Sequence, residues 1–489
     1  MVPLRISLLF CAALMVACAS PQAARAQIQS DSACTNLDKY SSQPTDSSVN
    51  SGQLTVDSYS SGHSGAWTLG ECIDYALEHN LQIRKNNANV EGSKIDVLEA
   101  EAQRGVSVSG SVSQQVQYHP FLESQSTIVN GSTTSSSSNK FIESGTYGIN
   151  AGWTLWDGGQ KRLAVENAKL AQTVAEIQNG LTGNSLQEQI ALLYVQTLYT
   201  QEALSVNSLQ LTVDSFLYFR ACEMVKAGVL ARAEAAELRA QWSQGKYDIV
   251  ATGAQIEQYK FKLKQLLELS PGEDFELAHT EISDAQALRL IPTKQDVYDA
   301  AVLARPEVRA SELAIQQSQM ATRIAKLGKL PTVDLSGSLG DSHVTGSGRN
   351  FFDQMKQNLA AVVGVSVSIP ILDNRKTKSA IERAKVNELT ARLDLLDTQK
   401  EIWNSIETYW TQATTNQAKF RAAKDNVAAA EESFEMRQAQ FKAGLKNIAE
   451  LQQTRSTLIQ AKQDMLVDKY TAAYNIAMLY FYKGQSLDL

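Results

Sequence analysis

The chain has 489 residues and a formal net charge of −7, and 20% of its residues are charged. This length suits one large or two medium domains, and the lack of a basic excess argues against a nucleic-acid partner because phosphates need lysines and arginines to neutralise them. The five histidines are scattered without metal-ligand spacing, and no P-loop, G-x-S-x-G or paired C-x-x-C motif is present. We therefore expect no enzyme, no cofactor and no metal site.

The N-terminal segment is typical of a secretory signal peptide. Arg5 precedes an apolar run over residues 6–19, and Ala24-Arg25-Ala26 has the A-x-A form of a cleavage site. We expect residues 1–26 to be removed, with lipid attachment at Cys18 as the weaker alternative. Either interpretation predicts that the protein leaves the cytoplasm.

Residues 27–65 are rich in Ser, Asp and Gln, which predicts a flexible N-terminal arm. Three cysteines remain after the signal segment. Cys34 and Cys72 could pair in an oxidising compartment, whereas Cys222 lies in a helical region and suits packing. No later apolar run reaches 18 residues, so a membrane-spanning form of the protein would have to use strands.

The chain repeats itself at an offset of 216 residues. LWDGGQKRLAVENAK at 155–169 aligns without gaps with ILDNRKTKSAIERAK at 371–385, and Lys226-Ala227-Gly228 falls on Lys442-Ala443-Gly444. Because packed helices tolerate insertions less well than loops do, this unbroken register indicates a rigid repeated element. We expect repeats at 66–270 and 294–482, a linker at 271–293 and a C-terminal tail at 483–489.

Very long helices are predicted in both repeats. No proline lies between 121 and 270 or after 370, and a proline would interrupt a helix. The runs Gln160 to Ala227 and Lys376 to Ala443 each predict one helix of roughly 100 Å, at about 1.5 Å per residue. Asn179-Gly180-Leu181-Thr182-Gly183 is a place where the first helix could bend. Each run stops at a glycine before helical sequence resumes, which predicts two antiparallel hairpins with return helices at about 230–269 and 446–482. Two further helices are expected near 69–103 and 294–328.

Side chains seven residues apart predict coiled-coil packing along the long helices. The positions are Ile190, Thr197, Leu204, Leu211, Tyr218 and Val225 in the first copy, and Ile406, Ala413, Phe420, Val427, Phe434 and Phe441 in the second. A second seam in the first copy is polar, with Thr200, Asn207 and Asp214, so we do not expect a simple two-stranded zipper.

Four segments alternate between apolar residues and small hydroxylated ones. They lie at about 106–118, 146–155, 332–339 and 363–369, and a low-complexity loop is expected at 131–139. In the first segment Val108, Val112 and Val116 share one face, and serines share the other. This pattern is the signature of outer-membrane strands, and aromatic residues near their ends suit the membrane interfaces.

A half-buried soluble sheet gives the same alternation and is the competing interpretation. We favour a barrel because the polar faces lack the lysines and glutamates that are common on solvated sheets. Four strands cannot close a barrel, and open edges would leave backbone groups unpaired in lipid, so several chains must pool their strands. Two chains would give eight strands around a filled interior, whereas three would give twelve with room for a pore, which favours a trimer.

Together these segments resemble the TolC-like outer-membrane efflux proteins, the outer-membrane component of tripartite efflux and type I secretion systems. The resemblance covers about residues 67–482 and is carried by LWDGGQKRLAVENAK, SIPILDNRKTKSAIERAK, ARPEVRASELAI, KAGVLARAEAAEL and KAGLKNIAELQQTR. It implies an α+β membrane protein with a trimeric twelve-stranded β-barrel, four strands per chain, continuous with a long α-helical coiled-coil barrel. It also implies a passive outer-membrane duct that extends into the periplasm and meets a periplasmic adaptor and an inner-membrane transporter of the RND or ABC type.

The resemblance also assigns roles to the two helical tips. Family members often carry acidic residues six and nine positions after the tip glycine, at the constriction. These positions hold Glu234 and Glu237 in the first copy and Glu450 and Gln453 in the second, so Gln453 departs from the pattern. The implied adaptor-contact residues are Lys226, Gly228, Val229, Lys442, Gly444 and Leu445.

A ring of Glu450 carboxylates from three chains would attract cations and screen charged cargo, although a solvated helix face is the default for any single glutamate. Charge placement suggests the hypothesis that Lys446 pairs with Glu234 of a neighbouring tip and helps to hold the pore shut. The alternative function is a periplasmic coiled-coil scaffold that binds partners without forming a pore. The cargo stays open between drugs, other small molecules and proteins.

Overall fold

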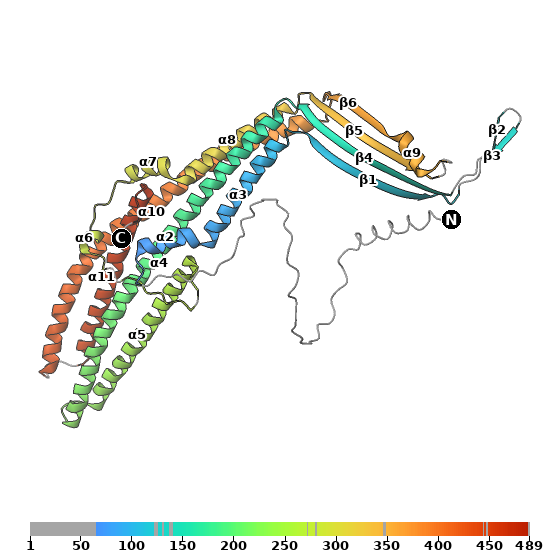
Figure 1. Cartoon of the computed structure of the whole chain (residues 1–489). Helices are drawn as coiled ribbons and strands as arrows, with labels where there is room; N and C mark the ends of the chain where they lie inside the picture. The colour runs from blue at the N-terminus through green and yellow to red at the C-terminus, as the bar shows by residue number, and fades with distance from the viewer. Residues whose placement is uncertain are drawn as a thin grey trace, which may run out of the picture. The chain divides into compact units, whose positions relative to one another are not determined.

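The computed structural model describes residues 65–121, 126–129, 132–135, 140–270, 272–278, 281–345, 349–443, 445 and 448–487. All of them belong to one compact unit that begins at Ser58. The predicted signal peptide, the arm up to residue 64, Cys18, Cys34, Gly444 and Lys446 lie outside the described residues. Figure 1 shows long helices that lead into a β-sheet.

Two helices of 67 residues run the length of the helical region. They are α4 (Gln160–Lys226) and α10 (Lys376–Lys442). α10 begins and ends 216 residues after α4, which equals the offset of the sequence repeat. Each begins after an aspartate that accepts a backbone N–H from its first turn: Asp157 from Lys161 at 2.7 Å, and Asp373 from Thr377 at 2.7 Å. The repeated aspartates therefore satisfy otherwise unpaired donors where the long helices start.

The first long helix does not break at its glycines. α4 is continuous through Gly180 and Gly183. A Cβ on Gly183 would lie only 3.2 Å from Leu77, and Gly180 faces Pro306. These glycines therefore allow other helices to pack closely against α4, and they do not mark a helix boundary.

The two predicted hairpins are present. The return helices are α5 (Arg232–Leu267), which packs on α4, and α11 (Ile448–Tyr482), which packs on α10 (Figure 1). All six predicted seam positions of the second copy are buried, from Ile406 to Phe441. In the first copy Ile190 and Thr197 are fully buried, but the seam is only half-buried from Leu204 towards the tip.

The two shorter predicted helices are each divided in the structure. The first is α2 (Leu69–His79) and α3 (Leu81–Ala102), and the second is α7 (Lys294–Ala304) and α8 (Pro306–Leu327). Asn80 makes the first break, because its side chain accepts the backbone N–H of Gln82 and donates to the carbonyl of Leu266 at 2.8 Å. Arg305 makes the second break, because the residue before a proline is disfavoured in helical conformation.

The four predicted strands form one antiparallel sheet in the order β1-β4-β5-β6. They are β1 (Ser107–Tyr118), β4 (Phe141–Trp156), β5 (Thr332–Val344) and β6 (Ala360–Ser368). Val112 lies opposite Tyr147, and Ile149 lies opposite Leu339, which in turn faces Ala361. The register therefore gathers the apolar residues of all four strands on one face.

Four elements were not predicted. β2 (Ser126–Val129) pairs with β3 (Ser132–Ser135), so part of the expected loop at 131–139 is a strand. The short helix α9 (Phe351–Asn358) lies between β5 and β6 in the chain, and the four-residue helix α6 (Asp284–Ala287) lies within the predicted linker at 271–293.

The main core lies where both hairpins meet α2, α7 and α8 (Figure 1). Cys72 is fully buried in this core, and burial raises the pKa of its thiol to about 12. Its predicted partner Cys34 is outside the described residues, so the disulfide stays a prediction. The segment before α2 joins the core through a parallel bridge between Trp67 and Leu277.

Candidate functional site: helical tips and strand face

The first helical tip ends in a left-handed glycine. Gly228 has a φ of +74°, and the next amide, Val229 N–H, donates to the carbonyl of Met224 at 2.9 Å. This is the usual way in which a glycine closes a helix C-terminus. Lys226 pairs with Glu223 at 2.7 Å on the surface, and Val229 is 71% exposed. The predicted contact residues of this tip therefore project outward.

The second tip has the same exposed apolar position. Leu445 stands 216 residues after Val229 and is 75% exposed, and its N–H donates to the carbonyl of Gln440 at 2.9 Å. Lys442 is exposed and donates to Gln438. Gly444 is outside the described residues. Each tip thus presents one bare aliphatic side chain beside a lysine.

The predicted constriction acids lie at the start of the return helices. Glu234 and Glu450 are half-buried in the first turns of α5 and α11, where the helix dipole favours a negative charge. Glu450 also accepts a hydrogen bond from Arg437 of α10 at 3.0 Å. Glu237 and Gln453 are exposed. Sequence analysis missed Arg437, because a spacing of thirteen residues across a turn carries no periodic signal.

Three polar contacts join the two hairpins along α4 and α11. We call them the polar ladder; its members are Glu202–Tyr470, Asn207–Gln463 and Asp214–Arg455. Residue numbers rise along α4 as they fall along α11, as antiparallel helices require. The polar seam that the sequence showed at Asn207 and Asp214 is therefore the contact between the hairpins.

The last contact of the polar ladder is a buried ion pair. Asp214 is 2% exposed, and the side chain of Arg455 is 14% exposed. The Nε of Arg455 donates to Oδ1 of Asp214 at 2.6 Å, and a second guanidinium nitrogen donates to Oδ2. Such two-point pairing fixes geometry as well as charge. Sequence analysis singled out Asp214 as a seam residue but did not identify its partner.

A second buried charge cluster lies at the middle of the helical region. Arg305, at the break between α7 and α8, is 5% exposed and lies 3.1 Å from Glu188 of α4 and 3.5 Å from Glu307. Its guanidinium carbon lies 3.7 Å from the centre of the Tyr482 ring. Burial raises the pKa of the Glu188 carboxyl, and Arg305 opposes that shift. The segment ARPEV thus ties α8 to α4 and α11.

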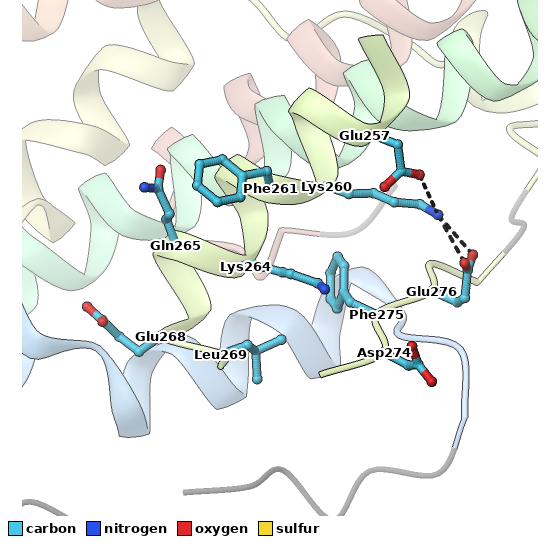
Figure 2. Close-up of a pocket in the computed structure, with 10 residues that line it drawn as sticks. All are labelled: Glu257, Lys260, Phe261, Lys264, Gln265, Glu268, Leu269, Asp274, Phe275 and Glu276. Carbon is cyan, nitrogen blue, oxygen red and sulfur yellow. Dashed lines mark hydrogen bonds and ion pairs between the residues drawn. The ribbon is translucent and has the colours of Figure 1, made fainter. Parts of the chain in front are cut away.

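A charged pocket with a volume of about 620 Å³ lies between the end of α5 and the segment that follows it. Figure 2 shows the side chains that line it. Lys260 is 9% exposed, and its Nζ lies 3.1 Å from both carboxylate oxygens of Glu276 and 3.6 Å from Glu257. Lys264 donates to the backbone carbonyl of Glu273 at 2.5 Å. Both lysines bind the chain's own acceptors, so we assign the pocket a structural role in holding this segment on α5.

The apolar face of the sheet is bare. Val112 is 78% exposed, Val363 is 80% and Val365 is 63%, and no described element covers most of this face. The half-buried soluble sheet is therefore wrong for the single chain. Burying each such side chain is worth about 1.5–3 kcal/mol, so the face strongly favours an apolar environment.

Both edges of the sheet are open within the described part of the chain. β1 and β6 each pair on one side only. No described helix combines the length and apolar character needed to cross a membrane. Across the same ranges, no group of three His, Cys, Asp or Glu residues could hold a metal ion.

Long helical hairpins that lead into a sheet with a bare apolar face define the class of outer-membrane channel proteins with helical ducts. Residues 297–485 match the family described as outer membrane efflux protein. The outer membrane efflux protein BepC of Brucella suis biovar 1 is 22% identical over 417 residues, which make up 83% of this chain and 85% of BepC. The outer membrane protein TolC of Escherichia coli K12 is 27% identical over 162 residues, or 31% of this chain and 32% of TolC.

The fold is also found among solved structures. The outer membrane protein VceC of Vibrio cholerae matches with a TM-score of 0.68 and 16% identity, over 86% of this chain and 97% of VceC. The predicted resemblance to the TolC-like outer-membrane efflux proteins is therefore confirmed.

Proposed function

We propose that this chain is the outer-membrane exit duct of a tripartite efflux or type I secretion system. It is a passive conduit that lies in the outer membrane and reaches into the periplasm. An inner-membrane pump supplies the energy for transport and is coupled to the conduit by a periplasmic adaptor. BepC and TolC are both named as outer membrane proteins, and BepC as an efflux protein, which supports this function over the scaffold alternative. The bare apolar strand face is the single observation that carries the proposal.

The open sheet edges support a closed assembly of several copies. Strand directions alternate from β1 to β6, so β6 of one copy and β1 of the next would also run antiparallel. Every backbone group in lipid then finds a partner, as a barrel requires. Three copies give about twelve strands, and this number leaves room for a pore, whereas about eight would leave only a filled interior. A homotrimer follows, with the long helices forming a coiled-coil barrel below the strands.

The helices support an internal duplication. α4 and α10 have equal lengths and begin at equivalent aspartates. We assign repeat one to 66–270 and repeat two to 294–482, joined by 271–293. The duplication gives each subunit two hairpins, so a trimer would present six tips around one axis.

The tips are the proposed gate and adaptor contact. Glu450 is anchored by Arg437, so three copies would hold three carboxylates at one height, and Glu234 lies at the equivalent place on the first hairpin. In a closed pore Lys446 would pair with Glu234 of the neighbouring copy. Val229 and Leu445 offer exposed apolar surface to the adaptor.

Planar-bilayer conductance of the detergent-extracted protein tests the duct. We expect discrete conductance steps from a species whose mass by native mass spectrometry is three times that of the chain. A water-soluble monomer without conductance would instead support the scaffold.

Charge reversal tests the gate. Lys446→Glu and Glu234→Lys should each raise conductance, since each places like charges across the proposed contact, and the double variant should return it towards the wild-type level. If each single variant conducted like the wild type, the proposed pairing would be wrong while the duct itself stood.

A further inference from the structure

Helix α9 lies beside the end of β5 that is farther from the long helices, where β6 no longer pairs with β5 (Figure 1). The centre of the Phe351 ring lies 4.9 Å from that of His343, and His343 stacks on Tyr147 at 5.8 Å. Tyr147 pairs with Val112 in the register, so these rings belong to the apolar face. If the face contacts lipid, Phe351 lies on the outer side of the barrel wall and α9 lies at its rim.

Polar side chains fix how α9 is oriented on the sheet. Gln354 is 6% exposed, and its Oε1 accepts the backbone N–H of Val344 at 2.9 Å. Asn358 donates to the carbonyl of Ser342 at 2.6 Å. Both residues lie on one side of the helix, four positions apart, so that side faces β5.

An adjacent side of α9 is apolar and uncovered. Phe352 is 78% exposed and Leu359, which follows the helix, is 58% exposed; helical spacing places Met355 between them. Leu359 also leads into the alternating apolar positions of β6, beginning at Ala361. The apolar flank of α9 is therefore continuous with the bare strand face. Asp353 and Lys356 are exposed on the remaining side.

We propose that α9 is an interfacial membrane helix that seats Phe352 and Leu359 in the lipid of the outer leaflet. The inference rests on the proposed outer-membrane barrel. Because the apolar flank of α9 is continuous with the strand face, it contacts the same lipid as the strands. The charges of Asp353 and Lys356 keep the helix at the boundary between acyl chains and headgroups, because a charge deeper in the hydrocarbon is costly. The helix thereby widens the lipid contact of each subunit at the outer rim.

Bromolipid quenching tests this placement on the full-length protein in vesicles. Phe352→Trp places a fluorophore on the apolar flank, and Asp353→Trp is the matched control one residue away. Each spectrum is taken as a difference from the wild type, which has 6 tryptophans. Lipid brominated near the carbonyl should quench the added signal at position 352 about twofold more than at 353, whereas aqueous acrylamide should favour 353. Leu359→Trp should behave like Phe352→Trp, and it replaces Phe352→Trp in the test if that variant does not fold.

Two outcomes would overturn the proposal. Lipid quenching that is equally weak at positions 352 and 353, with acrylamide access to both, would place α9 in water. Protection of position 352 from both quenchers would show that a neighbouring copy covers the helix. Conductance of the same vesicles separates these outcomes from failure of the duct. A conducting protein without lipid contact at 352 contradicts only the α9 proposal. A non-conducting protein in which Trp153→Phe removes no lipid-quenched signal contradicts the barrel.

Discussion

The seam inside the second hairpin and the seam between the two hairpins are built from different residues. Phe434, Phe441 and Leu451 fill the first, whereas the second adds the polar ladder to apolar residues of α4 such as Leu217. An apolar heptad resembles its neighbour seven residues away, so it gives cohesion with little preference for register. A buried polar pair finds its partner in one register only, which is the best-attested use of such pairs. The comparison indicates that apolar burial holds each hairpin together and that the ladder aligns one hairpin with the other.

The largest effect is expected inside a hairpin. Phe420 is 1% exposed and packs with Ala472 of α11. Phe420→Ala should cost about 3–5 kcal/mol, because it leaves a cavity in a seam that nothing else fills. Helical circular dichroism during heating measures the loss. Phe216→Ala, at a 57% exposed position on α4, is the control, and equal shifts for the two variants would contradict the assignment.

The ion pair of the polar ladder should give the next largest effect. Asp214→Asn leaves Arg455 without its counter-charge and should cost about 1.5–3 kcal/mol in the same melt. The loss is smaller than for the phenylalanine because Arg455 retains some contact with water.

A double variant then separates stability from register. Asp214→Leu with Arg455→Met should recover the stability lost by the single change, since apolar replacements of buried ion pairs are often neutral or stabilising. Spin labels on α5 and α11 should nevertheless report more than one spacing. A single, wild-type spacing would show that the pair does not set the register.

The charge cluster around Arg305 should make the stability of the folded protein depend on pH. Burial raises the pKa of Glu188, so the folded state binds this proton more tightly than the unfolded state does. Its contribution to stability is present below the ordinary glutamate pKa and is lost as pH rises through the raised folded pKa. The stability of the wild type relative to Glu188→Gln should therefore decline from pH 4 upward into the weakly acidic range. Thermal melts of both proteins at about ten pH values measure this decline. An advantage that grows with pH would mean that pairing with Arg305 outweighs burial.

The smallest effect is expected at the middle of the polar ladder. Asn207 accepts from Gln463 at 3.2 Å and donates to Thr252 at 3.4 Å. Asn207→Ala should cost about 0.5–1.5 kcal/mol, because the groups left behind are partly exposed and can bind water. A loss as large as that for Asp214→Asn would show that the ladder acts as one cooperative network.

Local pattern predicted most of the secondary structure. The absence of proline predicted α4 and α10 to within a residue at each end, and period-two alternation located all four strands of the sheet. The break at Asn80 was missed, since it depends on a contact with the distant Leu266. The break at Arg305 is local, because Pro306 follows it and begins α8. α9 was missed because eight residues are too few to show a helical period.

The sequence by itself determined the hairpins, the strands, the polar seam at Asn207 and Asp214, and the family, because periodicity, capping and glycine turns act over a few residues. Only the tertiary structure decided that Arg455 pairs with Asp214, that Arg437 donates a hydrogen bond to Glu450, and that the apolar strand face is exposed. The two contacts join residues on different helices. The exposure of the strand face depends on the absence of a described element that packs against most of it. No local spacing encodes either one, since each is fixed only when the helices and strands have packed together.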